Sequence, residues 1–147
     1  MALSFDEAYT MITDRLIAEW AAGTPVIVGS VPELRFEDVE KKPVPTSTFG
    51  RFVMNQVSGP QASQRNGEFG QRYENNGIII VQLLIARVDE TDAAIARKLA
   101  QLVVDIFRDP SFPGCFIFQN TRVQRLEPEP TFLRRNVVTE YQFDELV

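Results

Sequence analysis

The run from Gly77 to Arg87, GIIIVQLLIAR, constrains the fold more than any other part of the chain. Successive side chains of a strand point to opposite faces of a sheet, and here nearly every position is apolar, so both faces are apolar. This pattern is typical of a central strand that is covered above and below. We therefore expect the strand in the middle of a sheet, with its second face covered by a neighbouring subunit or by the second helix of the chain.

The first helix is expected from Phe5 to Ala22. Ser4 and Glu7 have the spacing of a capping box, apolar residues follow at helical intervals, and Gly23 offers the left-handed geometry that ends many helices. The segment Pro25 to Val28 is then expected to be a short strand, with the proline at its first position.

A second helix is expected from Asp92 to Arg108, capped by Asp89 or Thr91 and ending before a proline. Its apolar residues form a stripe opposite charged and polar residues. The acidic group of Asp89, Glu90 and Asp92 lacks the spacing of a calcium loop, and we interpret it as charge that complements the helix dipole.

The remaining strands follow from alternation and turn residues. Gly29 to Thr48 is expected to be a loop, Phe49 to Val57 a strand that forms a hairpin with Gly77 to Arg87, and Phe116 to Leu126 and Phe132 to Phe143 a second hairpin. In the last strand one parity is apolar and the other polar: Leu133, Val137, Tyr141 and Phe143 against Arg134, Asn136, Glu140 and Gln142. The order predicts a single α+β domain over residues 1–147, with two helices packed on a mainly antiparallel four- to five-stranded sheet and a long hairpin-tip loop.

Composition removes most catalytic mechanisms. The chain has no histidine and one cysteine, Cys115, so it lacks the Ser-His-Asp and Cys-His arrangements and histidine-ligated zinc. We expect Cys115 to be buried and inert, and we expect no catalytic residue, metal site or cofactor. The net charge of -5 opposes nonspecific binding to nucleic acid, and no apolar run approaches the roughly 20 residues of a membrane span. The first residues lack a secretory signal, so the protein is expected to stay in the cytoplasm where it is made.

The candidate contact residues lie at the tip of the first hairpin and on the last strand. The tip is rich in arginine and aromatic residues but poor in aliphatic ones, which is typical of an interface segment that orders on binding; a plain disordered loop is the alternative. The tip residues are Gln64, Arg65, Asn66, Phe69, Gln71, Arg72 and Tyr73. On the last strand Arg134 and Arg135 point to opposite faces, and Arg134, which shares the polar parity, is the better candidate.

The whole order of elements, with the opening MALSFDEAYTMITDRLIAEWAAGTPVIVGSVP, resembles the tail terminator proteins of long-tailed bacteriophages, including the lambda-like minor tail protein family. The hairpin over residues 49–87, the helix that follows and the closing strand NVVTEYQFDE complete the resemblance. It implies a hexameric ring in the virion, at the head-proximal end of the tail, that caps the tail tube, stops its growth and offers a surface to head-completion or connector proteins. DNA would pass through the ring only as cargo, and assembly would take place in the host cytoplasm.

Three alternatives stay open. Another neck, completion or minor tail protein would share the size, charge and fold style. A small nucleic-acid-binding module is suggested by the arginines between Arg122 and Arg135. A small enzyme that uses only carboxylates would depend on five residues, Asp89, Glu90, Asp92, Glu127 and Glu129; we interpret the last two as solvated charges of a proline turn.

Overall fold

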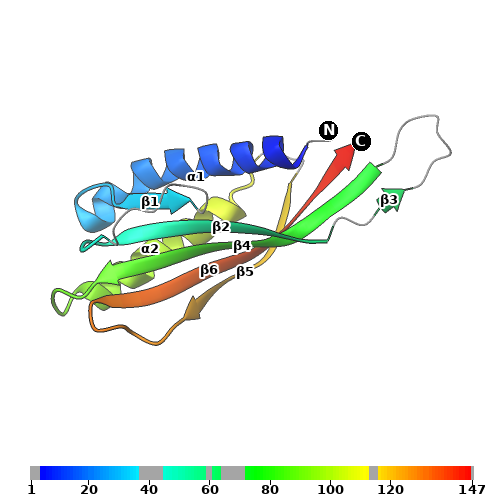
Figure 1. The fold of residues 1–147 in the computed structure, drawn as a ribbon. Helices are drawn as coiled ribbons and strands as arrows, with labels where there is room; N and C mark the ends of the chain where they lie inside the picture. Colours follow the sequence, from blue (N-terminus) through cyan, green and yellow to red (C-terminus); the bar gives the residue numbers. More distant parts are fainter. Residues whose placement is uncertain (1–3, 37–44, 59–60, 64–71, 113–115, 147) are drawn as a thin grey trace.

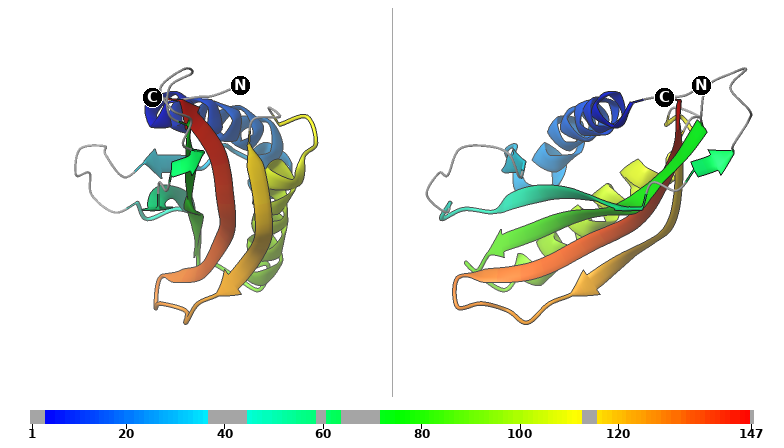
Figure 2. Two further views of the ribbon diagram at one scale, coloured as in Figure 1. Left: turned by 90° about the vertical axis from the view of Figure 1, so that its right-hand side faces the viewer. Right: turned by 45° about the vertical axis from the view of Figure 1, so that its right-hand side comes forward.

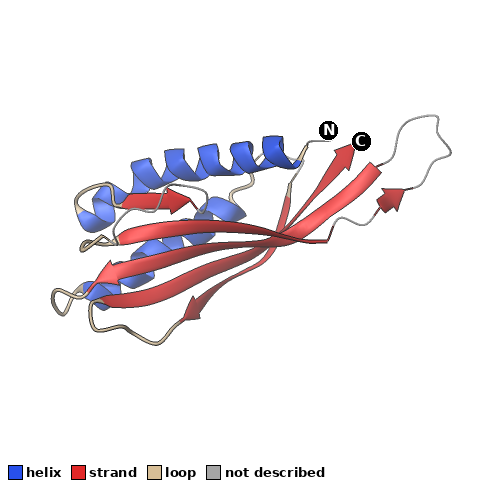
Figure 3. Cartoon of the chain, viewed as in Figure 1, coloured by secondary structure: helices blue, strands red, loops and turns tan. Residues whose placement is uncertain are grey.

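The computed structural model describes residues 4–36, 45–58, 61–63, 72–112 and 116–146. Two helices pack on a six-stranded sheet that is mostly antiparallel, which confirms the predicted α+β fold (Figure 3). The elements are α1 (Phe5–Val28), β1 (Glu33–Phe36), β2 (Phe49–Ser58), β3 (Gln61–Ser63), β4 (Arg72–Ala86), α2 (Asp92–Arg108), β5 (Ile117–Arg125) and β6 (Phe132–Leu146). Neither helix is long and apolar enough, over the part of the chain that is described, to cross a membrane.

The sheet has the strand order β1-β2-β4-β6-β5, and β3 pairs with β4 beyond this path (Figure 1). The pairing of β1 with β2 is parallel, and the other pairings are antiparallel. The long strand β4 is central, as its sequence predicts, and it pairs with β6 from Arg72 to Ala86.

Both helices lie on the same side of the twisted sheet (Figures 1 and 2). A single core joins their buried side chains to alternate residues of β2, β4 and β6; its largest fully buried members include Ile12, Leu16, Trp20, Phe52, Ile79, Leu83, Leu99, Tyr141 and Phe143. The expectation that the second helix covers the other side of β4 is therefore wrong for the described part of the chain, whereas cover by a neighbouring subunit stays a prediction. The second helix packs beside α1, not on the other side, because its apolar stripe is buried in this same core. We call the opposite side of the sheet the open face.

The capping box at the start of α1 is confirmed, because the Ser4 hydroxyl accepts the Glu7 N–H over 3.1 Å and the Glu7 carboxylate accepts the Ser4 N–H. The predicted end of α1 and the predicted strand from Pro25 to Val28 are both wrong. Gly23 lies inside the helix, where a Cβ would come within 2.6 Å of Leu102 on α2, so its small size serves helix packing. The helix continues through Pro25 and ends at Gly29, whose φ of 88° is the left-handed geometry of a C-cap.

The second helix has the predicted bounds. Thr91 is its N-cap residue but makes no capping bond with its side chain. The Asp92 carboxylate accepts the N–H groups of Val88 and Asp89, and the Asp89 carboxylate accepts the N–H of Thr91. These bonds to backbone donors satisfy the acidic residues locally, and no group of metal-binding side chains occurs among the described residues.

Two further corrections concern the loops. The segment from Gly29 to Thr48 contains β1, a short edge strand beside the start of β2 that no local pattern predicts. The hairpin tip is shorter than expected, because β4 begins at Arg72 rather than at Gly77 and β3 pairs with its first residues. The early start of β4 has a physical cause in β6, which extends to Leu146 and supplies a hydrogen-bonding partner for the added residues.

Candidate interaction surface

The open face is built from cross-strand rows of side chains on β2, β4 and β6. The register places Phe49 beside Leu84 and Arg134, and the next row brings Arg51, Gln82 and Asn136 together. Two further rows on the same face consist of Val53, Ile80 and Val138, and of Asn55, Ile78 and Glu140. The face therefore has a largely apolar middle with arginine and amide side chains on one side of it.

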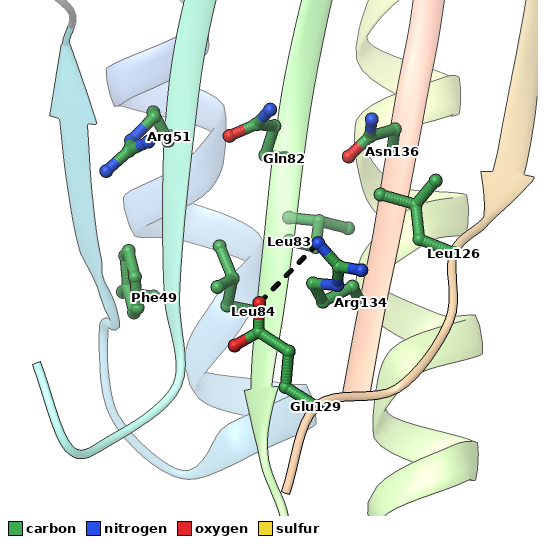
Figure 4. A pocket seen from close by; sticks show the side chains of 9 residues that line it. All are labelled: Phe49, Arg51, Gln82, Leu83, Leu84, Leu126, Glu129, Arg134 and Asn136. Carbon is green, nitrogen blue, oxygen red and sulfur yellow. Dashed lines mark ion pairs between the residues drawn. The ribbon is translucent and has the colours of Figure 1, made fainter. Parts of the chain in front are cut away.

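The apolar middle of this face is only partly covered. Ile78, Ile80 and Leu84 are half-buried, whereas their neighbours Ile79 and Val81 on the helix side are fully buried. Neighbouring side chains give this partial burial, because both helices lie behind the strands (Figure 4). The apolar residues of β4 thus retain area that another molecule could bury.

A hollow of about 350 Å³ lies on the open face where β6 begins (Figure 4). Its sides combine two guanidinium groups, two amides and one carboxylate with apolar side chains: Phe49, Arg51, Gln82, Leu83, Leu84, Leu126, Glu129, Arg134 and Asn136. The ring of Phe49 packs edge-on against Phe132, with 5.6 Å between the ring centroids.

The corner between β5 and β6 holds Arg134 in place. Its Nε donates to the Glu127 carbonyl oxygen over 3.0 Å, and its Nη1 lies 3.5 Å from the Glu129 carboxylate. The guanidinium of Arg87 donates to the Glu129 carbonyl oxygen, and this bond fixes the corner against the end of β4. Arg134 is consequently oriented across the hollow before any partner binds.

The structure describes three of the predicted contact residues, and only one of these lines the hollow. Arg134 lies on the polar parity of β6, as predicted, and lines the hollow. The backbone of Arg72 and Tyr73 belongs to β4 and pairs with β6, so these two residues are not part of a loop. The other tip residues, Gln64, Arg65, Asn66, Phe69 and Gln71, lie outside the described residues, as does Cys115.

Sequence reasoning missed most of the hollow. Phe49, Arg51, Gln82 and Leu84 come from the first hairpin, and nothing local marks them as neighbours of Arg134. The available signal was the alternation of β2, in which Phe52 and Met54 share the core parity and Phe49 and Arg51 therefore share the other. Combining that parity with the polar parity of β6 would have found the hollow only if the strand order had been known.

The hollow suits binding. Guanidinium and amide groups donate hydrogen bonds to carboxylates and backbone carbonyls, and the apolar side chains can cover an aliphatic or aromatic group. Of the carboxylates in the alternative enzyme set, Asp89 and Asp92 lie together and accept hydrogen bonds from backbone groups at the start of α2, whereas Glu129 pairs with Arg134.

Comparisons with known proteins inform the fold alone. No family model and no curated protein matches the chain. Among solved structures 21 chains match, and one of them covers 92% of this chain and 94% of its own length. That structure has a TM-score of 0.61 and 8% sequence identity, and its name describes no function. This α+β arrangement therefore occurs in other proteins.

Proposed function

We propose that the chain is a structural virion protein that caps the tail tube of a long-tailed phage. In this role a ring of copies, expected to be a hexamer, ends tube polymerisation and presents the surface that head-completion or connector proteins join. The observation that carries the proposal is the open face, where Ile78, Ile80 and Leu84 of β4 stay half-buried because neither helix packs on that side. The resemblance of the whole chain to tail terminators is the reason why we propose a ring on the tail tube as the assembly.

The open face gives the proposal a physical basis. Burial of apolar surface contributes about 25 cal/mol per Å² removed from water, so the exposed parts of Ile78, Ile80 and Leu84 favour association. Arg51, at the edge of the apolar middle, can bind a carbonyl or carboxylate group of a tube subunit. The net charge of -5 suits a ring through which DNA passes, because it opposes retention of the polyanion.

Deletion of the gene from its phage tests the proposal. We expect tails of abnormal and variable length that do not join heads, because nothing ends tube growth. Expression of the intact chain in the same cells should restore tails of uniform length. Normal tails joined to heads in the deletion phage would refute the proposal.

Another neck or completion protein remains the nearest alternative within the same class. It differs in the place of action: loss of such a protein leaves tail length normal and prevents only joining. Electron microscopy of the deletion phage therefore separates the two functions by tail length alone.

A nucleic-acid-binding module is less well supported. Two of the arginines that suggest it have carboxylate partners, since Arg122 lies 3.8 Å from Glu140 and Arg134 lies 3.5 Å from Glu129. Ion pairing reduces the charge that these side chains offer to phosphates. Tight, salt-sensitive binding to DNA or RNA at low ionic strength would favour this alternative.

A further inference from the structure

Two arginines lie side by side at the edge of the sheet without an acidic partner. Arg125 of β5 is directly opposite Arg135 of β6, and neither forms an ion pair with any described residue. Like charges in this position repel one another and destabilise the strand pair. Burial, and after it the charge of Arg125, lowers the pKa of the Arg135 guanidinium. The isolated chain thus keeps an unfavourable pair that a carboxylate would relieve.

An exposed aliphatic side chain adjoins this pair. Val123 lies two residues before Arg125 on the same face of β5, which is the helix side of the sheet. Its partner Val137 is fully buried, yet Val123 is 45% exposed, so α2 covers β6 and leaves this part of β5 bare. Val123, Arg125 and Arg135 form what we call the basic edge patch.

The opposite edge of the molecule carries a patch of complementary character on α1. Asp14 is exposed and has no ion-pair partner among the described residues. Ile17, three residues further along, is on the same side of the helix and is 47% exposed. Asp14 and Ile17 form the acidic helix patch.

The two patches are on opposite flanks of the fold. Helix α1 lies next to β1 and β2. The ring centroids of Tyr9 and Phe52 are 5.8 Å apart, and the Trp20 indole N–H donates to the Pro32 carbonyl oxygen. The basic edge patch involves β5, which is at the other end of the strand order. One chain cannot bring the patches together, whereas two chains in the same orientation can.

We propose that the acidic helix patch of one chain docks on the basic edge patch of a second copy, in a head-to-tail contact. The Asp14 carboxylate would lie between the guanidinium groups of Arg125 and Arg135, and Ile17 would pack on Val123. Because the two surfaces differ, the contact is heterologous and repeats around a ring or along a filament. This inference rests on the proposed capping function and identifies the flanks by which its copies would join.

Cysteine cross-linking tests the contact in the full chain. In a Cys115→Ser background, Ile17→Cys together with Val123→Cys is oxidised at high protein concentration and low salt. We expect a ladder of disulfide-linked oligomers, since each chain offers one cysteine to each neighbour. Either cysteine alone should give no ladder. The matched control is Val26→Cys with Val88→Cys, two residues that are 89% and 80% exposed and lie outside both patches.

Charge variants test the same contact without cross-linking. We expect Asp14→Arg alone, and Arg125→Glu with Arg135→Glu, each to reduce self-association at least tenfold in sedimentation experiments. All three substitutions together should restore it, because the charges are exchanged. Added salt should weaken the native contact, because dissolved ions screen the attraction between the charged groups and the Debye length is only about 10 Å at 0.1 M ionic strength.

The outcomes separate this contact from the proposed function. A cross-linked ladder with unchanged tube growth would support the contact and refute capping. Capping that survives in the charge variants, with no disulfide formed in the Ile17→Cys, Val123→Cys protein, would overturn the contact and leave capping in place. Binding of the basic edge patch to DNA in place of a second copy, lost in Arg125→Glu with Arg135→Glu, would also overturn it.

Discussion

Gly77 of β4 lies opposite Tyr141 of β6, and a Cβ at Gly77 would come within 2.7 Å of the phenol oxygen and into contact with the Asn55 carbonyl oxygen. The carbonyl belongs to the ladder between β2 and β4, so it cannot move without loss of pairing. Glycine is therefore required here by the close approach of two strands and an aromatic side chain.

The first prediction concerns this position. We expect Gly77→Ala to lower the free energy of unfolding by about 1–3 kcal/mol through overpacking, measured by urea denaturation. Gly29→Ala is the control, because Gly29 has a φ of 88° but no atom within 4 Å of a Cβ, and its cost of about 1 kcal/mol is conformational only. A Gly77→Ala protein as stable as the native chain would contradict the packing described.

The second prediction concerns Trp20, the only tryptophan of the chain. Its buried indole N–H donates over 2.8 Å to the Pro32 carbonyl oxygen, just before β1. We expect Trp20→Phe to cost about 1–3 kcal/mol of unfolding free energy, because the buried carbonyl loses its donor. Circular dichroism follows the unfolding of the variant, and an unchanged midpoint would show that the bond contributes nothing to stability.

A third prediction concerns alkaline pH. Burial raises the pKa of Tyr141 from 10.0 to about 12. As the pH rises, the phenol of the unfolded chain loses its proton before the buried phenol of the folded chain does. The contribution of Tyr141 to the free energy of unfolding is therefore constant below pH 10 and falls as the pH rises toward 12. Ultraviolet titration should show a late phenolate step that Tyr141→Phe removes. If that step occurs near pH 10, the phenol is not buried as described.

A fourth prediction compares two neighbours on β4. Ile80 is half-buried on the open face, whereas Val81 is fully buried on the helix side. We expect Val81→Ser to cost about 3 kcal/mol of unfolding free energy and Ile80→Ser about 1 kcal/mol. Ile80→Ser should nevertheless abolish tube capping while the protein remains folded. Equal destabilisation by the two substitutions would mean that the open face is covered within the chain.

Sequence reasoning succeeded where local patterns carry the information. Residues from Asp92 to Arg108 have a strongly one-sided apolar stripe, and the bounds of α2 follow from it. It failed at Gly23, because a helix-packing glycine and a helix-ending glycine look the same in sequence. Only the contact with Leu102 distinguishes them, and that residue belongs to the other helix, far along the chain and beyond the reach of local rules.

The candidate surface was less predictable because it depends on strand order. The parity of Arg134 was correct, since alternation within one strand is a local property. Its neighbours Phe49 and Arg51 come from β2 and reach it only because β4 lies between β2 and β6. Both described helices lie on the other side of the sheet, so one face of β4 has no helix over it in that part of the chain, whereas its sequence shows only that both faces are apolar.

Growth of tail tubes in vitro tests the proposed function most directly. Purified tube protein of the same phage is polymerised with and without the chain, and tube lengths are measured by electron microscopy. Capping predicts shorter tubes as the chain is added, with the protein found at one end of each tube. An unchanged length distribution with no protein at the tube ends would contradict the proposed function.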